Sequence, residues 1–548
     1  MGQAMRAGDA ILAGQAKPIR TRSPARRTHP SAPAARTPDW AHLPMLRAGV
    51  VTKAGAMAGT FQVGFTTQPV ELCLDRLPVR GVIPPWLAGT LIRNGPAMFE
   101  VGGSPLRHWF DGFAMLHRFS IHGGAVAYAN RFLRSRAYRQ AVATGRITMR
   151  EFATDPCRRM FGRIMSAFSS RPTDNSHVGV ARLAGVYLAM TETPLAVRFD
   201  PETLETLGVV RDAGPGAGTT TAHPHFDAGR GEALNSFTRF GRRTSYTIQR
   251  IGARVRELAS LPVAEPGYIH SFGMSARSAI LAEYPFVVNP LDILLSGRPF
   301  IENFRWHPER PVRFLLFDRE DGRVQAYEAD PFFAFHHVNA FEHGGDTFVD
   351  LIAYPDSSPI AAFYLDTLRR TGAAPVGELR RYRLTVGRRT AGYEVLSPVP
   401  VEIPRIDYER CQMRPYRFVY GVGARLPHNF NDQILKIDTS SGAAQAWYEE
   451  NCYPGEPIFV RHPEARAEDD GAVLSVVLDG RAGTSFLLVL EAASFAELGR
   501  ALVPQHIPFG FHGEFFAGET PALTPPRPDD RTPSETGRPA GSHPRSRP

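Results

Sequence analysis

Short strand-like segments recur along most of this chain of 548 residues, and few segments have the apolar spacing of a helix. Glycine-containing turns such as Ile121–Val126 and Asp318–Val324 are typical of hairpins that join antiparallel strands. A chain this long exceeds the usual size of a domain with a single core. The pattern therefore predicts an all-β protein with a repetitive architecture, namely a β-propeller. The clearest strand-like segments are Gly89–Arg93, Met115–Ile121, Val126–Leu133, Val186–Glu192, Arg313–Asp318, Phe348–Tyr354, Glu378–Leu384 and Phe486–Leu490.

The two ends of the chain differ in composition from the part between them. We expect residues 1–63 to form a disordered basic tail rich in Pro, Ala and Arg, residues 64–516 the propeller domain, and residues 517–548 a disordered tail rich in Pro. The net charge is +9, but residues 1–60 contribute +7, from nine Lys and Arg against two Asp and Glu, and residues 517–548 contribute +1, which leaves about +1 for the propeller. Nucleic-acid binding needs a basic footprint on the folded domain, so we expect no nucleic-acid partner.

The cysteines and the apolar runs give information on the cellular compartment of the protein. The four cysteines include no Cys-x-x-Cys pair, so they indicate neither a disulfide framework nor a thiolate metal site. No run approaches the roughly 18 apolar residues of a membrane span. We therefore expect a cytoplasmic protein whose contact with a membrane is peripheral.

Four histidines are the candidate metal ligands, and they lie far apart in the chain. The steps between them are 47, 66 and 176 residues, much longer than the spacing of a zinc finger or of two ligands on one helix. In a propeller the innermost strands of different blades all run beside the axis, so four blades can each supply one inward side chain. Taken singly, each histidine would more often be an ordinary hydrogen-bonded residue. The four are His223, His270, His336 and His512.

Long motifs around these positions resemble the carotenoid cleavage oxygenase family, from about Gly64 to Phe516. The similarity is greatest to the animal branch that contains the β-carotene central-cleavage oxygenase and the retinal pigment epithelium retinoid isomerase. The matching stretches are Gly89–Pro96, Trp109–Phe119, Phe199–Thr206, Tyr453–Pro463 and Glu468–Val477.

The resemblance implies a seven-bladed propeller in which a few short helices and loops form a cap over an axial Fe(II) site. The four histidines would bind the iron, and the neighbouring His225 and His337 would not. Three glutamates would accept a hydrogen bond from the other ring nitrogen of a ligand, which fixes the tautomer of the imidazole and raises its basicity. These glutamates are Glu192, Glu402 and Glu456.

The activity implied is that of a non-haem iron dioxygenase. Such an enzyme uses O2 to cleave a conjugated C=C bond of a carotenoid or apocarotenoid and releases two carbonyl products. Likeness to the animal branch favours central cleavage to retinal. Three alternatives stay open: a stilbene-cleaving dioxygenase of the same family, a retinoid isomerase that consumes no O2, and a carotenoid-binding propeller without catalysis. The sequence does not indicate an oligomeric state.

Membrane contact follows from the implied substrate, because carotenoids partition into bilayers. One segment mixes basic and apolar residues as an interfacial helix does. A second candidate is the apolar stretch Tyr284–Leu295. The membrane-docking candidates in the first segment are Arg158, Arg159, Met160, Phe161 and Ile164.

Overall fold

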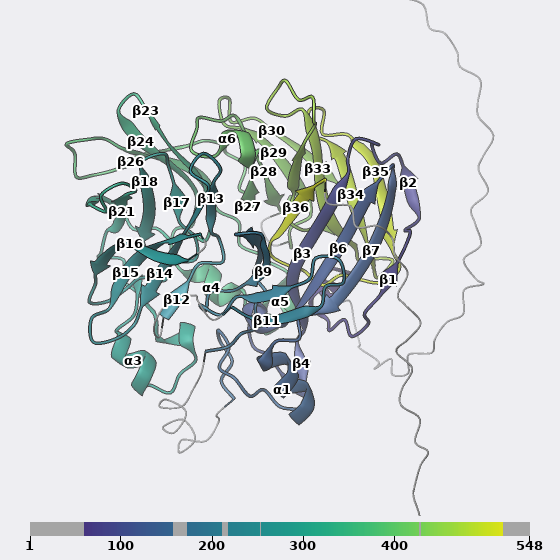
Figure 1. The fold of residues 1–548 in the computed structure, drawn as a ribbon, viewed down its shortest axis with the longest axis horizontal. Coiled ribbons are helices and arrows are strands. Elements are labelled where there is room, and N and C mark those ends of the chain that lie inside the picture. Colours follow the sequence, from purple (N-terminus) through teal and green to yellow (C-terminus); the bar gives the residue numbers. More distant parts are fainter. Residues whose placement is uncertain (1–59, 157–171, 211–217, 253, 427–428, 519–548) are drawn as a thin grey trace, which may run out of the picture. The chain divides into compact units, whose positions relative to one another are not determined.

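Seven antiparallel sheets of four to six strands surround a common axis (Figure 1). The computed structural model describes residues 60–518 except 157–171, 211–217, 253 and 427–428. The seven-bladed β-propeller that the sequence predicts is confirmed. The boundaries of the two terminal tails stay a prediction, because the tails lie almost entirely outside the described residues.

The first three blades hold the following strands. Blade 1 consists of β1 (Cys73–Leu74), β3 (Gly89–Met98), β6 (Phe113–His122), β7 (Ala125–Phe132) and β36 (Gly513–Ala517). Blade 2 consists of β8 (Gly179–Leu183), β9 (Val186–Met190), β10 (Val197–Phe199) and β11 (Thr206–Val209). Blade 3 consists of β12 (Gly218–Thr220), β13 (His225–Asp227), β14 (Glu232–Arg239), β15 (Ser245–Ile251) and β16 (Val255–Pro262).

The other four blades follow in chain order. Blade 4 consists of β17 (Gly273–Met274), β18 (Ser278–Glu283), β21 (Val312–Asp318) and β22 (Val324–Ala329). Blade 5 consists of β23 (His337–His343), β24 (Asp346–Ala353), β25 (Glu378–Leu384) and β26 (Gly392–Val395). Blade 6 consists of β27 (Glu402–Arg405), β28 (Phe418–Gly423), β29 (Gln433–Asp438) and β30 (Ala444–Tyr448). Blade 7 consists of β2 (Val79–Gly81), β31 (Cys452–Pro454), β32 (Ile458–Arg461), β33 (Gly471–Asp479), β34 (Thr484–Glu491) and β35 (Glu497–Val503).

The ring of blades is closed by strands from the two ends of the described chain. The N-terminal strand β2 pairs with β35 in blade 7, and the C-terminal strand β36 pairs with β3 in blade 1. Gly513 lies opposite Arg93 in this second ladder, where a Cβ atom would come within 2.6 Å of the backbone oxygen of Ile92. Only glycine fits at such a close approach of two backbones. Closure therefore fixes the start of β36 against β3.

Neighbouring blades pack face to face, so many strands are apolar on both faces. In β34 the six residues Ser485–Leu490 are all buried. Leu487 packs in a cluster shared by blades 7 and 1, whereas Leu488 packs in a cluster shared by blades 6 and 7. Because successive side chains point to opposite faces of a sheet, one strand contributes to two interfaces. This double burial explains why the sequence shows apolar runs rather than clean alternation.

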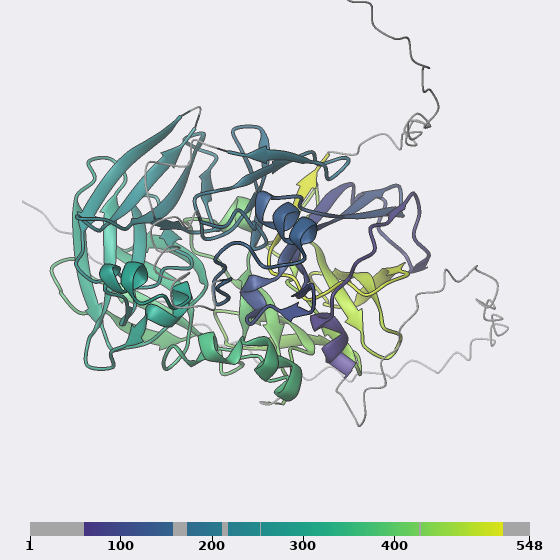
Figure 2. The same cartoon turned by 90° about the horizontal axis from the view of Figure 1, so that it is seen from below.

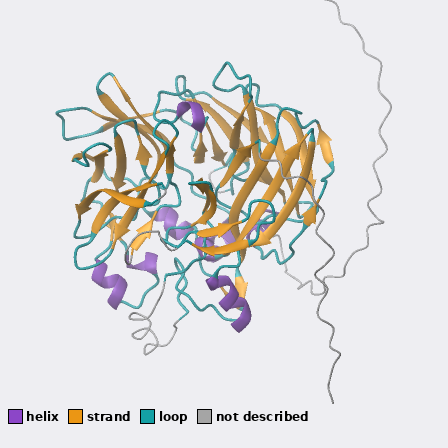
Figure 3. Cartoon of the chain, viewed as in Figure 1, coloured by secondary structure: helices purple, strands orange, loops and turns teal. Residues whose placement is uncertain are grey.

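Helices are short, and most of them lie toward one end of the propeller (Figures 2 and 3). An aspartate holds the 3-10 helix η3 in place, because the Asp111 carboxylate accepts hydrogen bonds from the backbone N–H groups of His108 and Ala153. The backbone N–H of Trp109 then donates to the carbonyl of Phe363, at 3.0 Å. This contact joins η3 to the segment after α4, and the two together cap one end of the axis. The helices are η2 (Thr60–Phe65), η3 (Trp109–Asp111), α1 (Arg136–Thr144), α3 (Pro290–Leu295), η4 (Phe300–Asn303), α4 (Ser358–Ala362), α5 (Leu365–Thr371) and α6 (Tyr408–Cys411).

Two short strand pairs lie outside the blades. They are β4 (Glu100–Val101) with β5 (Ser104–Pro105), and β19 (Phe286–Val287) with β20 (Arg305–Trp306). Within the described residues, none of the helices is both long enough and apolar enough to cross a membrane.

Candidate functional site

The structure brings together all four histidines that the sequence singles out. One nitrogen from each of them lies within 4.8 Å of the corresponding nitrogens of the other three. The two closest pairs are Nε2 of His223 with Nε2 of His270, at 3.2 Å, and Nε2 of His336 with Nε2 of His512, at 3.3 Å. Four ring nitrogens therefore converge on one point.

The topology explains how such remote residues meet. His270, His336 and His512 each come shortly before the innermost strand of a blade, and His223 lies in the gap between the two short strands β12 and β13. The three blades that supply no histidine each supply one of the glutamates: Glu192 follows β9, Glu402 begins β27, and Glu456 lies between β31 and β32. Each of the seven blades thus contributes one residue.

The three glutamates bind three of the histidines through the outward ring nitrogen. Nδ1 of His270 donates to Glu192 at 2.6 Å, Nδ1 of His336 to Glu402 at 2.6 Å, and Nδ1 of His512 to Glu456 at 2.7 Å. An imidazole that donates from Nδ1 carries its free lone pair on Nε2. Each carboxylate thereby turns Nε2 of its partner into an acceptor aimed at the centre. Among the described residues no carboxylate binds His223 in this way.

Two of the glutamates are further fixed by tyrosines that the sequence analysis did not single out. The hydroxyl of Tyr268 donates to Glu192 at 2.6 Å, and that of Tyr354 donates to Glu402 at 2.5 Å. Both tyrosines are buried. A neutral donor holds the carboxylate in place without cancelling its charge, so these two carboxylates keep the negative charge that offsets a bound cation.

The third glutamate has different partners. Glu456 binds the guanidinium groups of Arg93 and Arg405, the latter at 2.8 Å. Burial by itself would raise the pKa of Glu456, but the two guanidinium groups outweigh it and hold this pKa below its usual value. Glu456 is therefore ionised and accepts the hydrogen bond of His512 throughout the neutral range.

Burial lowers the pKa of three of the four histidines and so favours their neutral form at physiological pH. Burial lowers the pKa of His512 to about 4, although Glu456 opposes the shift. Burial, together with the other three histidines, lowers the pKa of His223 well below its usual value. The pKa of His270 is also lowered by burial, against the influence of Glu192. Neutral imidazole is the form that binds metal ions, so His223, His270 and His512 can bind a cation without first losing a proton.

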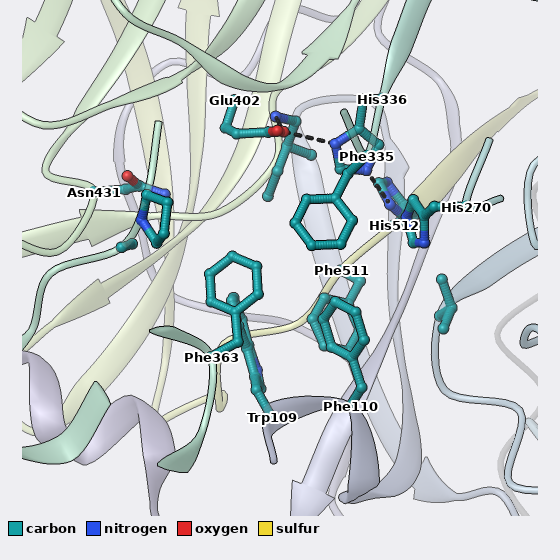
Figure 4. Close-up of a pocket in the computed structure, with 14 residues that line it drawn as sticks. Trp109, Phe110, His270, Phe335, His336, Phe363, Glu402, Asn431, Phe511 and His512 are labelled. Carbon is teal, nitrogen blue, oxygen red and sulfur yellow. Dashed lines mark hydrogen bonds and ion pairs between the residues drawn. The ribbon is translucent and has the colours of Figure 1, made fainter. Parts of the chain in front are cut away.

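An apolar cavity with about 550 Å³ of empty space reaches the histidines from the capped end (Figure 4). Its walls are mostly aromatic. The indole N–H of Trp109 donates a hydrogen bond to the backbone carbonyl of Phe509, at 3.0 Å. Its lining consists of Trp109, Phe110, Val178, His270, Phe335, His336, Phe363, Ala374, Pro375, Glu402, Ile403, Asn431, Phe511 and His512.

The histidines next to the candidate ligands point elsewhere. His225 binds the hydroxyl of Tyr408 and the carbonyl of Phe272, both at 2.8 Å, and His337 binds the hydroxyl of Ser271 at 2.9 Å. Neither belongs to the four-histidine group. This placement agrees with the expectation that the first member of each pair faces the centre.

The candidates for membrane contact divide into two sets. Arg158, Arg159, Met160, Phe161 and Ile164 lie outside the described residues. The second candidate stretch ends in α3, where three leucines are exposed. They are Leu291, Leu294 and Leu295, with exposed fractions of 59%, 53% and 73%.

Sequence reasoning missed the tyrosines, the arginines and the aromatic lining. Arg93 lies in the matching stretch Gly89–Pro96, and Trp109 begins another. These motifs indicated that the two stretches belong to the family pattern. They could not indicate the ion pair between Arg93 and Glu456, because these residues are 363 positions apart in the chain.

Comparisons with known proteins agree with this geometry. The model of the family described as "Retinal pigment epithelial membrane protein" matches residues 65–517. The mitochondrial carotenoid-cleaving dioxygenase of Mustela putorius furo is 36% identical over 504 residues, which cover 80% of this chain and 93% of that protein. The β,β-carotene 15,15'-dioxygenase of Mus musculus is 32% identical over 544 residues, which cover 85% and 94%.

Solved structures give the same result. The cobalt-substituted apocarotenoid oxygenase of Synechocystis superposes with a TM-score of 0.75 at 27% identity, over 84% of this chain and 98% of that one. The family match, the two relatives and the propeller with its four converging histidines lead to one conclusion. The chain belongs to the carotenoid cleavage oxygenase family.

Proposed function

We propose that this protein is an Fe(II)-dependent dioxygenase that cleaves a conjugated C=C bond of a carotenoid or apocarotenoid to give two carbonyl products. The observation that carries the proposal is the convergence of four histidines at the end of an aromatic cavity. The relatives are named as carotenoid-cleaving and carotene dioxygenases, and the solved structures as an apocarotenoid oxygenase.

The donor set fits a divalent transition metal. Imidazole nitrogens about 2.1 Å from a shared metal and at right angles lie about 3 Å apart, close to the 3.2 and 3.3 Å measured between the Nε2 pairs. Imidazole suits iron, and four such ligands leave room for others on a metal that commonly takes six. His223, His270, His336 and His512 would hold the ion, and Glu192, Glu402 and Glu456 would orient three of them.

The chemistry that Fe(II) supplies in this site is activation of O2, whose two oxygen atoms become the two carbonyl oxygens. The residues of the chain have the other tasks. Phe110, Phe335, Phe363 and Phe511 form apolar walls against which a rigid polyene can lie, and they keep water away from the reacting bond. By fixing the polyene in one register, the cavity selects the bond that is cleaved.

Central cleavage to retinal is the finer part of the proposal. It is supported by the similarity to a β,β-carotene 15,15'-dioxygenase of comparable length. Aerobic incubation of the Fe(II)-loaded protein with β-carotene, an apocarotenal and resveratrol, followed by product analysis, tests both parts. Retinal formed only with O2 is the expected result. A different apocarotenal would overturn central cleavage, phenolic aldehydes alone would indicate stilbene cleavage, and no product from iron-loaded protein would refute the dioxygenase.

Membrane contact through α3 completes the proposal. Three exposed leucines on one short helix, with the exposed Arg298 nearby, suit an interface where apolar groups enter the bilayer and a cation meets its headgroups. Replacing Leu291, Leu294 and Leu295 by serine is expected to weaken co-sedimentation with anionic liposomes. Replacing the equally exposed Val386, on another blade, is the matched control. Equal sedimentation of both proteins would contradict this contact.

A further inference from the structure

Asn431 is a buried polar side chain that the arrangement around the histidines does not use. It lies in the loop between β28 and β29, is 7% exposed, and lines the apolar cavity. Its Oδ1 atom is buried and has no hydrogen-bond partner among the described residues. In Figure 4 it lies on the opposite side of the cavity from His270 and His512.

The other polar groups of the cavity wall are engaged. Trp109 donates to a backbone carbonyl, and Glu402 binds His336 and Tyr354. The rest of the cavity lining, apart from the histidines, consists of aromatic and aliphatic groups such as Phe363, Ala374 and Pro375. An amide buried without a partner destabilises a fold, and native proteins rarely keep one. Such a group in a binding cavity indicates a partner that arrives with the ligand.

The free atom determines the chemistry of that partner. Oδ1 accepts hydrogen bonds, so it needs an O–H or N–H donor. A hydrocarbon polyene has none, and an aldehyde offers only an acceptor. We propose that Asn431 binds a hydroxyl group of the substrate, so that the preferred substrates are hydroxylated carotenoids or apocarotenoid alcohols. The proposal rests on the proposed function, since it takes the cavity to be the site of the polyene.

A hydrogen bond at this position would also set the register. The polyene is smooth along its length, and aromatic walls alone let it slide. A single polar anchor away from the histidines fixes the distance from the hydroxyl group to the bond that reacts. Asn431 is thus a specificity residue that touches substrate remote from the reacting bond.

Binding under anaerobic conditions tests the proposal without turnover. The probes are zeaxanthin and β-carotene, which share one skeleton with and without ring hydroxyls, and an apocarotenol with its aldehyde. Quenching of tryptophan fluorescence reports binding, because Trp109 lines the cavity. We expect the hydroxylated member of a pair to bind roughly tenfold more tightly to the unmodified protein. A preference for zeaxanthin over β-carotene alone would identify a ring hydroxyl as the group that binds Asn431. A preference for the apocarotenol over its aldehyde alone would identify a hydroxyl at the end of the polyene chain.

The variants separate the role of the amide from its volume. Asn431→Leu keeps the size but removes the polar atoms, and is expected to abolish the preference by weakening the hydroxylated probes. Asn431→Ser keeps an acceptor and is expected to retain part of it. No preference in the unmodified protein, preference for the aldehyde, or an unchanged preference in Asn431→Leu would each overturn the proposal. A buried water as the true partner would give the first of these results.

Catalysis provides the independent check. If a preference for hydroxyl groups is measured but no polyene is cleaved, the proposed function fails and the role of Asn431 in binding stands. If polyenes are cleaved but both members of each pair bind equally well, the proposed function stands and the role of Asn431 in binding fails. With cleavage established, Asn431→Leu is expected to release products of more than one chain length from the hydroxylated substrate.

Discussion

At the scale of single residues, the three carboxylates around the histidines are not equivalent. Glu192 and Glu402 each take a tyrosine hydroxyl, whereas Glu456 takes two guanidinium groups. The first two leave their negative charge available to a cation held by the histidines. The third has its charge compensated by arginine, so it serves mainly to orient His512.

This difference leads to a prediction for Glu402→Gln. The amide keeps the shape but carries no negative charge to offset a cation bound by His336, and we expect metal affinity to fall by about 10- to 100-fold. Competitive titration with Co(II), followed by absorption, measures the change. Glu394→Gln, on the exposed strand β26, is the control and should bind metal normally. Equal affinity in both variants would contradict the role of Glu402.

Sequence reasoning found the histidines and glutamates because each sits in a local motif. It could not find the partners of these residues. Tyr268 lies 76 residues from Glu192, and Arg405 lies 51 residues from Glu456. Contacts between residues so far apart depend on the order of the blades around the axis. A local sequence pattern therefore cannot predict them. Asn431 was missed for a further reason: what marks it is a missing hydrogen bond, visible only in three dimensions.

At the scale of elements, the long strands followed from their sequence and the short inner ones did not. The predicted segment Glu378–Leu384 coincides with β25, and Phe486–Leu490 lies inside β34. In contrast, β17 has only two residues, too few to show any periodicity. The strands nearest the axis are interrupted where they present a ligand, as between β12 and β13.

Packing between blades yields the second prediction, for Leu487→Ala. Leu487 is fully buried between blades 7 and 1, so truncation leaves a cavity where the ring closes. We expect the free energy of unfolding to fall by about 2–5 kcal/mol. Denaturant unfolding measures this loss. Val386→Ala, at a side chain 71% exposed, should change stability little, and a similar loss in both would refute the argument.

A buried ion pair between blades 3 and 4 gives a pH-dependent prediction. Arg319 is fully buried and binds Asp227. Burial raises the pKa of Asp227, but Arg319 and the backbone N–H groups of Gly229 and Arg230 together lower it by more, so the folded pKa lies below the ordinary value of 3.8. The stabilisation is therefore complete above the unfolded pKa and is lost as the pH falls through the folded pKa.

The variant Asp227→Asn isolates this contribution. At neutral pH it leaves the charge of Arg319 poorly compensated, and we expect a loss of about 3 kcal/mol in the free energy of unfolding. As the pH falls from the unfolded pKa of Asp227, near 3.8, to its lower folded pKa, the difference from the unmodified protein should shrink, because below the folded pKa both proteins lack the carboxylate charge. Urea unfolding at neutral and acidic pH tests this. A difference that is independent of pH would show that the pair contributes through shape alone.

At the scale of the whole molecule, the candidate metal centre depends on ring closure. His512 immediately precedes β36, the strand that completes blade 1. A chain ending at Phe511 lacks both, and we expect it to bind no stoichiometric metal and to melt at a lower temperature. A chain ending at Gly518 keeps every described strand and is the control. Stoichiometric metal in the shorter chain, measured by elemental analysis, would show that three histidines suffice.

The position of β36 also sets when a cell can assemble the centre. His223 leaves the ribosome 289 residues before His512, which at about 5–20 residues per second is roughly 15–60 s of translation. For the last 176 residues of that interval, from His336 to His512, three imidazoles exist without the fourth, and throughout it blade 1 lacks its innermost strand. A complete four-histidine centre can therefore form only after His512 has been synthesised, and a metal bound by all four histidines would mark a chain able to complete blade 1.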